Sequence, residues 1–290
     1  MTFSKEWSLI YKKNLQINNW PFSELISYTI RFSKLNKTNF RVLELGCGSG
    51  PNIPFFLSLN AEYFGIGDLE VSHNDEMLAY SLDLKGSEYF TITVRKISDN
   101  KIISEEIKET SGSVTWSLDN KYIFYSKLDK HHRPRKIYRH KIGTRTKKDK
   151  LIYEEKDEGF TCGIGISSDE KYFFVGTANL TTSEIYFFNV NEDNPKLKLF
   201  RKRQKEIKYL VDSWKGNFYI HTNLDAEDYK ICKCKHENIR KWKDYIPATK
   251  GVLIGGFDLL NEWMVRSELR DALAKLYIKN LKNNNEEELV

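Results

Sequence analysis

The sequence predicts a mixed fold that is mainly all-β: a partial β-propeller of four to five blades, preceded by a small α/β Rossmann-like βαβ fragment. Two observations support this prediction. A strand pattern recurs from Val71 to Leu281 with a nearly constant period, and ahead of it a short apolar strand runs directly into a glycine-rich loop. With 290 residues, 40% of them hydrophobic and 13% aromatic, the chain is long enough to bury a large core.

Three segments of the recurring pattern begin almost identically, with a serine, a polar turn and then an apolar run. They are Ser72–Ser81, Ser117–Ser126 and Ser167–Gly176, which start 45 and 50 residues apart; a weaker copy, Ser213–Thr222, starts 46 residues further on. The polar turn is expected to join two strands, and the apolar run predicts an inner strand that packs on both faces. Self-similarity at this period is typical of a β-propeller, in which each repeat forms one four-stranded blade.

A second strand with alternating apolar residues follows each copy. These strands are expected at Tyr89–Ile97, Lys136–Ile142, Glu184–Val190 and Tyr229–Cys234, with a fifth at Ala274–Leu281 after Trp263–Val265. Because one blade cannot bury its own faces, the copies must stack against one another.

The first 68 residues have a different character. The pattern predicts helices within residues 1–40, a strand at Arg41–Leu45, a glycine loop at Gly46–Gly50, a helix at Asn52–Leu59 and a strand at Tyr63–Ile66. This order is the opening of a doubly wound α/β sheet. We therefore predict an α/β segment at residues 1–68, propeller blades at 69–282, and a polar, acidic tail at 283–290 that frays.

The charge of the chain does not indicate a nucleic-acid surface. The net charge of +6 is spread along the chain: residues 1–68 hold 7 basic and 5 acidic residues, a net +2, which leaves +4 for the rest. The basic clusters at Lys127–Lys150 and Lys196–Lys208 alternate with aromatic residues or lie in expected loops, a pattern typical of solvated outer strands and loops.

No apolar run approaches the roughly 20 residues of a membrane span, so neither nucleic acid nor membrane is expected as a partner. The start of the chain lacks the apolar core of a signal peptide, and four cysteines without framework spacing suit a reducing cytoplasm.

The glycine loop has a recognisable chemistry. Glycines at the carboxyl end of a parallel strand let the backbone turn sharply and approach a ligand, and Glu44 at the strand end can meet an ammonium group. The run Val42–Pro51 resembles the first motif of class I S-adenosylmethionine-dependent methyltransferases. The resemblance implies a cofactor site formed by Glu44, Gly46, Cys47, Gly48, Gly50 and Asp68. In that family an acidic residue ends the second strand and binds the ribose; here Gly67 holds that position and Asp68 follows one residue later.

The remainder resembles the N-terminal propeller of the oligopeptidase B group in the prolyl oligopeptidase family. The resemblance covers residues 67–281 and is carried by Leu78–Asp83, Gly86–Tyr89, Thr110–Trp116, Arg133-Pro134, Tyr138–Gly143, Tyr153–Asp157, Thr182–Glu184 and Phe218–Asn223. It implies a non-catalytic cap over a separate α/β-hydrolase domain that cleaves short basic peptides after Arg or Lys. The chain contains no Gly-x-Ser-x-Gly nucleophile elbow. We therefore expect no catalytic residue and no peptide hydrolysis by this chain alone.

Three interpretations stay open on the sequence: the gating propeller of a serine peptidase, an S-adenosylmethionine-dependent methyltransferase, and a free-standing propeller that serves as a binding scaffold. The two resemblances meet near Tyr63–Asp68, as a hybrid chain would. Smaller signals favour structural roles. The one-residue spacing of Cys232 and Cys234, followed by His236, is not the spacing of zinc ligands, so no metal site is predicted. His131-His132 and Asp225–Asp228 are expected in an exposed loop and a plain turn.

Overall fold

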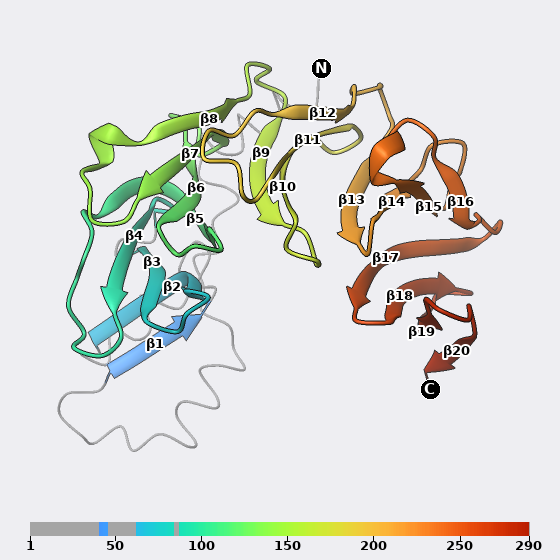
Figure 1. Cartoon of the computed structure of the whole chain (residues 1–290), viewed down its shortest axis with the longest axis horizontal. Helices are drawn as coiled ribbons and strands as arrows, with labels where there is room; N and C mark the ends of the chain where they lie inside the picture. The colour runs from blue at the N-terminus through green and yellow to red at the C-terminus, as the bar shows by residue number, and fades with distance from the viewer. Residues whose placement is uncertain (1–40, 46–61, 84–86, 290) are drawn as a thin grey trace. The chain divides into compact units, whose positions relative to one another are not determined.

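The computed structural model describes residues 41–45, 62–83 and 87–289, and the regular secondary structure of these residues is almost entirely β-strand (Figure 1). The helices expected within residues 1–40 and at Asn52–Leu59, and the glycine loop Gly46–Gly50, lie outside the described residues. The chain forms two compact units that divide between Gly159 and Phe160. The predicted boundaries at residues 68 and 282 stay a prediction.

The first unit contains one continuous sheet whose strands follow in chain order. They are β1 (Arg41–Leu45), β2 (Glu62–Val71), β3 (Met77–Asp83), β4 (Phe90–Lys96), β5 (Ile107–Trp116), β6 (Tyr122–Leu128), β7 (Pro134–Lys141) and β8 (Lys150–Glu154), with a 3-10 turn at Thr146–Lys148. Strands β1 and β2 are parallel, as the βαβ interpretation requires, and every later neighbouring pair is antiparallel. β2 therefore belongs to both patterns: one edge pairs with β1 and the other with β3.

The second unit contains three four-stranded antiparallel sheets, the composition of propeller blades. The first holds β9 (Thr161–Ile166), β10 (Tyr172–Ala178), β11 (Ser183–Asn189) and β12 (Lys198–Arg201); the second holds β13 (Tyr209–Trp214), β14 (Asn217–Thr222), β15 (Lys230–Lys235) and β16 (Lys243–Ile246); the third holds β17 (Val252–Leu260), β18 (Trp263–Arg270), β19 (Leu273–Asn280) and β20 (Glu286–Leu289). A 3-10 turn at His236–Asn238 follows β15.

A shared turn explains why the repeats begin alike. Ser117 Oγ accepts the amide of Tyr122 at 3.0 Å and donates to Asp119 at 2.7 Å, while Asn120 adopts a φ of +58°. The copies at Ser72 and Ser167 use the same contacts. A left-handed residue three positions after the serine closes a tight hairpin turn, so the motif fixes where each inner strand begins.

The predicted strands are confirmed, although several extend beyond their predicted ends. The inner strands β3, β6, β10 and β14 overlap the four repeat copies, and β18 begins at Trp263 as predicted but continues to Arg270. The expected second strands correspond to β4, β7, β11, β15 and β19. Tyr63–Ile66 is the first half of the longer β2.

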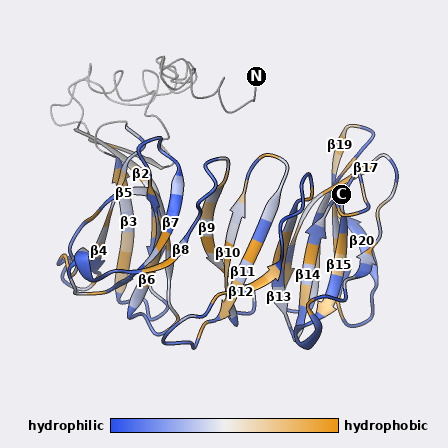
Figure 2. Cartoon of the chain, turned by 90° about the horizontal axis from the view of Figure 1, so that it is seen from above, coloured by the Kyte–Doolittle hydropathy of each residue, from blue (hydrophilic) through white to orange (hydrophobic). Residues whose placement is uncertain are grey.

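The apolar residues pack between sheets, as stacked blades require. In the second unit one cluster joins the sheet of β9–β12 to that of β13–β16, and it includes Phe187, Phe200, Phe218 and Tyr209. A second cluster around Tyr219, Ile254 and Met264 joins β13–β16 to β17–β20. Figure 2 shows the hydrophobic segments concentrated along the strands.

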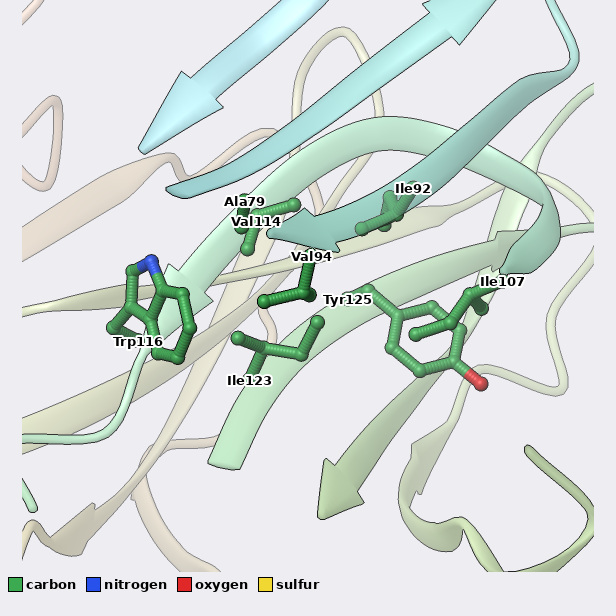
Figure 3. Packing of buried hydrophobic residues seen from close by; sticks show 8 residues of the cluster. All are labelled: Ala79, Ile92, Val94, Ile107, Val114, Trp116, Ile123 and Tyr125. Atoms are coloured by element: carbon green, nitrogen blue, oxygen red, sulfur yellow. The ribbon is translucent and has the colours of Figure 1, made fainter. Parts of the chain in front are cut away.

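The core of the first unit lies between β3–β4 and β5–β6. Ile92 and Ile123 have no exposed surface, and Trp116 covers one end of the cluster (Figure 3). Two bulges, one in β2 at Gly67 and one in β5 at Gly112, make room for Phe90 beside this core. A Cβ on Gly67 would come within 2.4 Å of the Phe90 ring, and Gly112 has a φ of +94°. Strand β5 pairs with β4 at Ile107 and Thr110 and with β6 at Thr110 and from Val114 to Trp116.

The expectation of a frayed tail is wrong for residues 286–289, which form β20 against β19. Its acidic side chains meet basic partners on the neighbouring strands. Glu286 bonds to the Arg266 guanidinium, and Glu288 accepts from Lys275 at 2.7 Å. Opposite charges across a ladder offset the self-repulsion of the acidic run.

Candidate functional site

The residues predicted to bind S-adenosylmethionine are only partly described. Gly46, Cys47, Gly48 and Gly50 lie outside the described residues, and Glu44 is described as a backbone position on β1. Asp68 lies on β2, where its Oδ2 accepts the amide of Val114 at 2.9 Å and its own amide donates to Ser81 at 2.9 Å. The carboxylate thus links β2 to β5.

A cleft of about 800 Å³ opens in the first unit beside the ends of β3 and β6. Four side chains of its lining are acidic and two are basic. The lining residues are Leu82, Asp83, Ser87, Tyr89, Thr91, Thr93, Glu106, Lys108, Glu109, Leu128, Asp129 and Lys130. The excess of negative charge suits a cationic ligand, because a cleft with low-dielectric walls concentrates the field of its charges.

Two of these carboxylates also hold the walls of the cleft. Asp83 accepts the amide of Glu88 at 2.6 Å, and Asp129 accepts the amide of His131 at 2.8 Å. The ring of Tyr89 lies 4.0 Å from that of His132, and partial burial, together with the nearby Asp129 carboxylate, raises the pKa of Tyr89. The predicted exposed loop at His131-His132 is confirmed, and it borders this cleft.

A second group of polar residues was missed by the sequence reasoning. Ser104, His140 and Asp149 form a hydrogen-bonded line, and Tyr125 donates to the far oxygen of Asp149 at 2.9 Å. A cleft of about 700 Å³, lined in part by Tyr125 and Asp149, lies beside it. Ser104 and His140 are 36 positions apart in the sequence, and no local motif predicts such a contact. The only indication in the sequence was a polar histidine at an inward-facing position of β7.

The cysteine and histidine cluster on β15 is built into the core. Burial raises the pKa of the Cys232 thiol to about 12 and that of Cys234 to about 11. His236 faces Ser213 at 2.9 Å, and its ring centroid lies 4.3 Å from that of Phe218. Within the described ranges, no group of three or more His, Cys, Asp or Glu residues has the geometry of a metal site.

The repeating sheets and the serine turns define the class of protein. Residues 56–289 match the family described as prolyl oligopeptidase, N-terminal beta-propeller domain, and the chain belongs to this family. The family assignment confirms the oligopeptidase-like propeller expected from the sequence. It does not show the methyltransferase-like segment that was predicted at the start of the chain.

Individual relatives are peptidases. The chain is 26% identical to dipeptidyl aminopeptidase BI of Pseudoxanthomonas mexicana over 226 residues, which cover 77% of this chain and 31% of that protein. It is 30% identical to protease 2 of Moraxella lacunata over 175 residues, or 60% of this chain and 25% of that protein.

Solved structures share the fold. The structure of oligopeptidase B from Leishmania major matches with a TM-score of 0.74 at 21% identity, covering 78% of this chain and 33% of that one. Oligopeptidase B from Trypanosoma brucei with covalently bound antipain matches with a TM-score of 0.72 at 26% identity, covering 78% and 33%. The chain therefore spans about a third of the length of these relatives. Among the described residues no helix is long and apolar enough to cross a membrane.

Proposed function

We propose that this chain is the substrate-gating propeller of a serine peptidase that cleaves short peptides after Arg or Lys, with an α/β-hydrolase domain as a separate catalytic partner. The single observation that carries the proposal is the family match over residues 56–289, which covers the propeller portion of relatives named as peptidases. The relatives are about three times as long as the matched segment, which supports a role for a second domain.

The acid-lined cleft supports basic peptides as the ligand. Glu106 and Glu109 are exposed at its lining, and Asp129 is half-buried there. Exposed carboxylates steer cationic peptides toward a surface more than they hold them tightly, and salt weakens this attraction. The expected contribution is therefore to the rate of peptide entry.

Reconstitution tests this proposal. The full chain is mixed with a separately expressed hydrolase domain of protease 2, and cleavage of short Arg and Lys reporter peptides is compared with cleavage of an unfolded protein. We expect the mixture to cleave the short basic peptides and to spare the unfolded protein, whereas the chain alone does neither. A mixture whose activity equals that of the hydrolase domain alone would contradict the gating role.

A variant pair tests the part played by charge. Glu106→Gln with Glu109→Gln should lower kcat/KM for basic peptides in the reconstituted mixture, and the loss should shrink at high salt. The matched control replaces Glu158 and Glu170, exposed acidic residues outside the lining, with glutamine. Equal losses in both pairs would show that only the overall charge of the chain matters.

We also propose, for the glycine loop, that Glu44, Gly46, Cys47, Gly48 and Gly50 bind S-adenosylmethionine. The parallel pairing of β1 with β2 supports it, because a βαβ cofactor loop begins at the end of such a strand. Titration calorimetry of the full chain with S-adenosylmethionine measures it directly, with Gly48→Val as the variant and Asp68→Asn to test the ribose contact. Absence of heat at millimolar cofactor would exclude it.

The cytoplasm is the compartment we propose. Cys232 and Cys234 are buried thiols outside any disulfide, a state that a reducing compartment preserves. Fractionation of cells that express the full chain would place it, and recovery from an oxidising compartment would overturn the proposal.

A further inference from the structure

Ser104, His140 and Asp149 are joined in the order that activates a serine for nucleophilic attack. Ser104 Oγ lies 2.5 Å from His140 Nε2, and His140 Nδ1 lies 2.7 Å from Asp149 Oδ1. His140 belongs to β7 and has no exposed surface, while the Asp149 side chain is 3% exposed. The three residues come from separate segments of the first unit.

The carboxylate of Asp149 sets the state of the imidazole ring. A neutral histidine that donates its Nδ1 proton to a carboxylate presents the lone pair of Nε2 to its other neighbour. Here that neighbour is the hydroxyl of Ser104, which donates to Nε2. Tyr125 holds the second oxygen of Asp149 at 2.9 Å, so the carboxylate is fixed at both ends.

Ser104 is the accessible end of this line. It is half-buried, in contrast to His140, and Glu105 and Glu106, which follow it, line the cleft of about 700 Å³. Ile107, Tyr125 and Tyr138 give this cleft an apolar and aromatic wall.

We propose that Ser104 is a nucleophilic residue that reacts with small acyl esters and with organophosphorus electrophiles at the edge of this cleft, next to Glu105 in its lining. Ser104 Oγ attacks the carbonyl carbon, its proton passes to His140 Nε2, and the alcohol leaves with that proton to give an acyl-serine. Water then attacks the acyl group, gives its proton to His140, and releases the acid as the proton returns to Ser104. This activity goes beyond the gating function and needs no hydrolase domain.

Labelling of the full chain tests the proposal. The chain is incubated with an alkyne-tagged fluorophosphonate; attack by Ser104 forms the phosphorus–oxygen bond and expels fluoride, and the modified residue is identified by peptide mass spectrometry. We expect modification at Ser104, at a rate at least ~100-fold above the residual rate in Ser104→Ala, since general-base catalysis contributes about 10²–10⁴-fold. Ser168→Ala is the matched control, because Ser168 bonds to the carboxylate of Asp212 and not to a histidine; it should label normally.

The orienting carboxylate separates activation by the histidine from simple exposure. The carboxylates near the ring are Asp149 and Glu105, the latter bound by Thr146. In Asp149→Asn the labelling rate should fall, because an amide no longer favours the ring tautomer that carries its proton on Nδ1.

Three results would overturn the proposal: no modification of Ser104 in the folded chain, an unchanged rate in Asp149→Asn, or an unchanged rate in His140→Gln. If His140→Gln fails to fold by circular dichroism, the unmodified chain, Ser104→Ala and Asp149→Asn decide the matter through the site and the rate of labelling. A negative result would define the line as purely structural and would leave the gating function untouched, because that function is measured with an added hydrolase domain.

Discussion

Phe218 is the residue whose replacement tests the stacked-sheet organisation most directly. It lies on β14 with no exposed surface. Its ring stands 5.2 Å from that of Phe200 and 5.6 Å from that of Phe187, both edge-on and both on the preceding sheet. Truncation therefore removes a contact between two sheets rather than within one.

The expected magnitude follows from burial and ring geometry. Removing a buried phenylalanine side chain costs about 3–5 kcal/mol, because the transfer term is joined by a cavity that relaxes only in part. Each edge-on aromatic pair adds roughly 0.5–1.5 kcal/mol. We expect Phe218→Ala to lie at the upper end of that range, and Phe218→Leu, which leaves a smaller cavity, to cost about half as much.

Urea unfolding of the second unit, followed by near-ultraviolet circular dichroism, measures the loss by linear extrapolation. The matched control is Leu210→Ala on β13 of the same sheet, because Leu210 is 66% exposed; it should change the free energy of unfolding by less than about 0.5 kcal/mol. If Phe218→Leu and Leu210→Ala destabilised equally, the cluster between the sheets would not be the source of stability.

Other predictions follow from close contacts and from shifted pKa values. Gly67→Ala should destabilise the first unit by about 1–3 kcal/mol in the same titration, because its Cβ would collide with Phe90. Cys232 and Cys234, whose pKa values burial raises to about 12 and about 11, should resist a thiol reagent at pH 8 in the folded chain and react in urea; rapid reaction without urea would contradict this. The Arg266 guanidinium lowers the pKa of Glu286, so the stability it contributes is present above the carboxyl's unfolded pKa and lost as the pH falls through the lower folded value. Glu286→Gln should flatten the acid limb of a melting-temperature profile.

The repeats were predictable because their signal is local. A serine that accepts the amide five residues later fixes the turn before any long-range contact forms, so Ser72, Ser117 and Ser167 marked their inner strands to within a few residues. The outer strands β8, β12 and β16 are short, and each begins with a lysine, a residue that is common on strands at sheet edges. Because loops are also short and polar, these strands could not be distinguished from loops in the sequence.

The candidate site was less predictable, since its geometry depends on distant segments. His140 looked like an ordinary strand residue, and its partners Ser104 and Asp149 lie 36 and 9 positions away. The order of the tail was not predicted for a similar reason. The sequence alone does not show that basic side chains of β18 and β19 face the acidic residues of β20.

Strand β2 has a consequence for any shortened version of the chain. Its outer edge is capped by the parallel strand β1, through pairs from Arg41 with Glu62 to Leu45 with Ile66. A fragment that began at residue 62 would present those donors and acceptors unpaired, as a template on which a second molecule could add. Protein engineers who isolate the peptidase-like portion should retain β1 or place charged residues along β2, because the natural neighbour also serves as a guard against self-association.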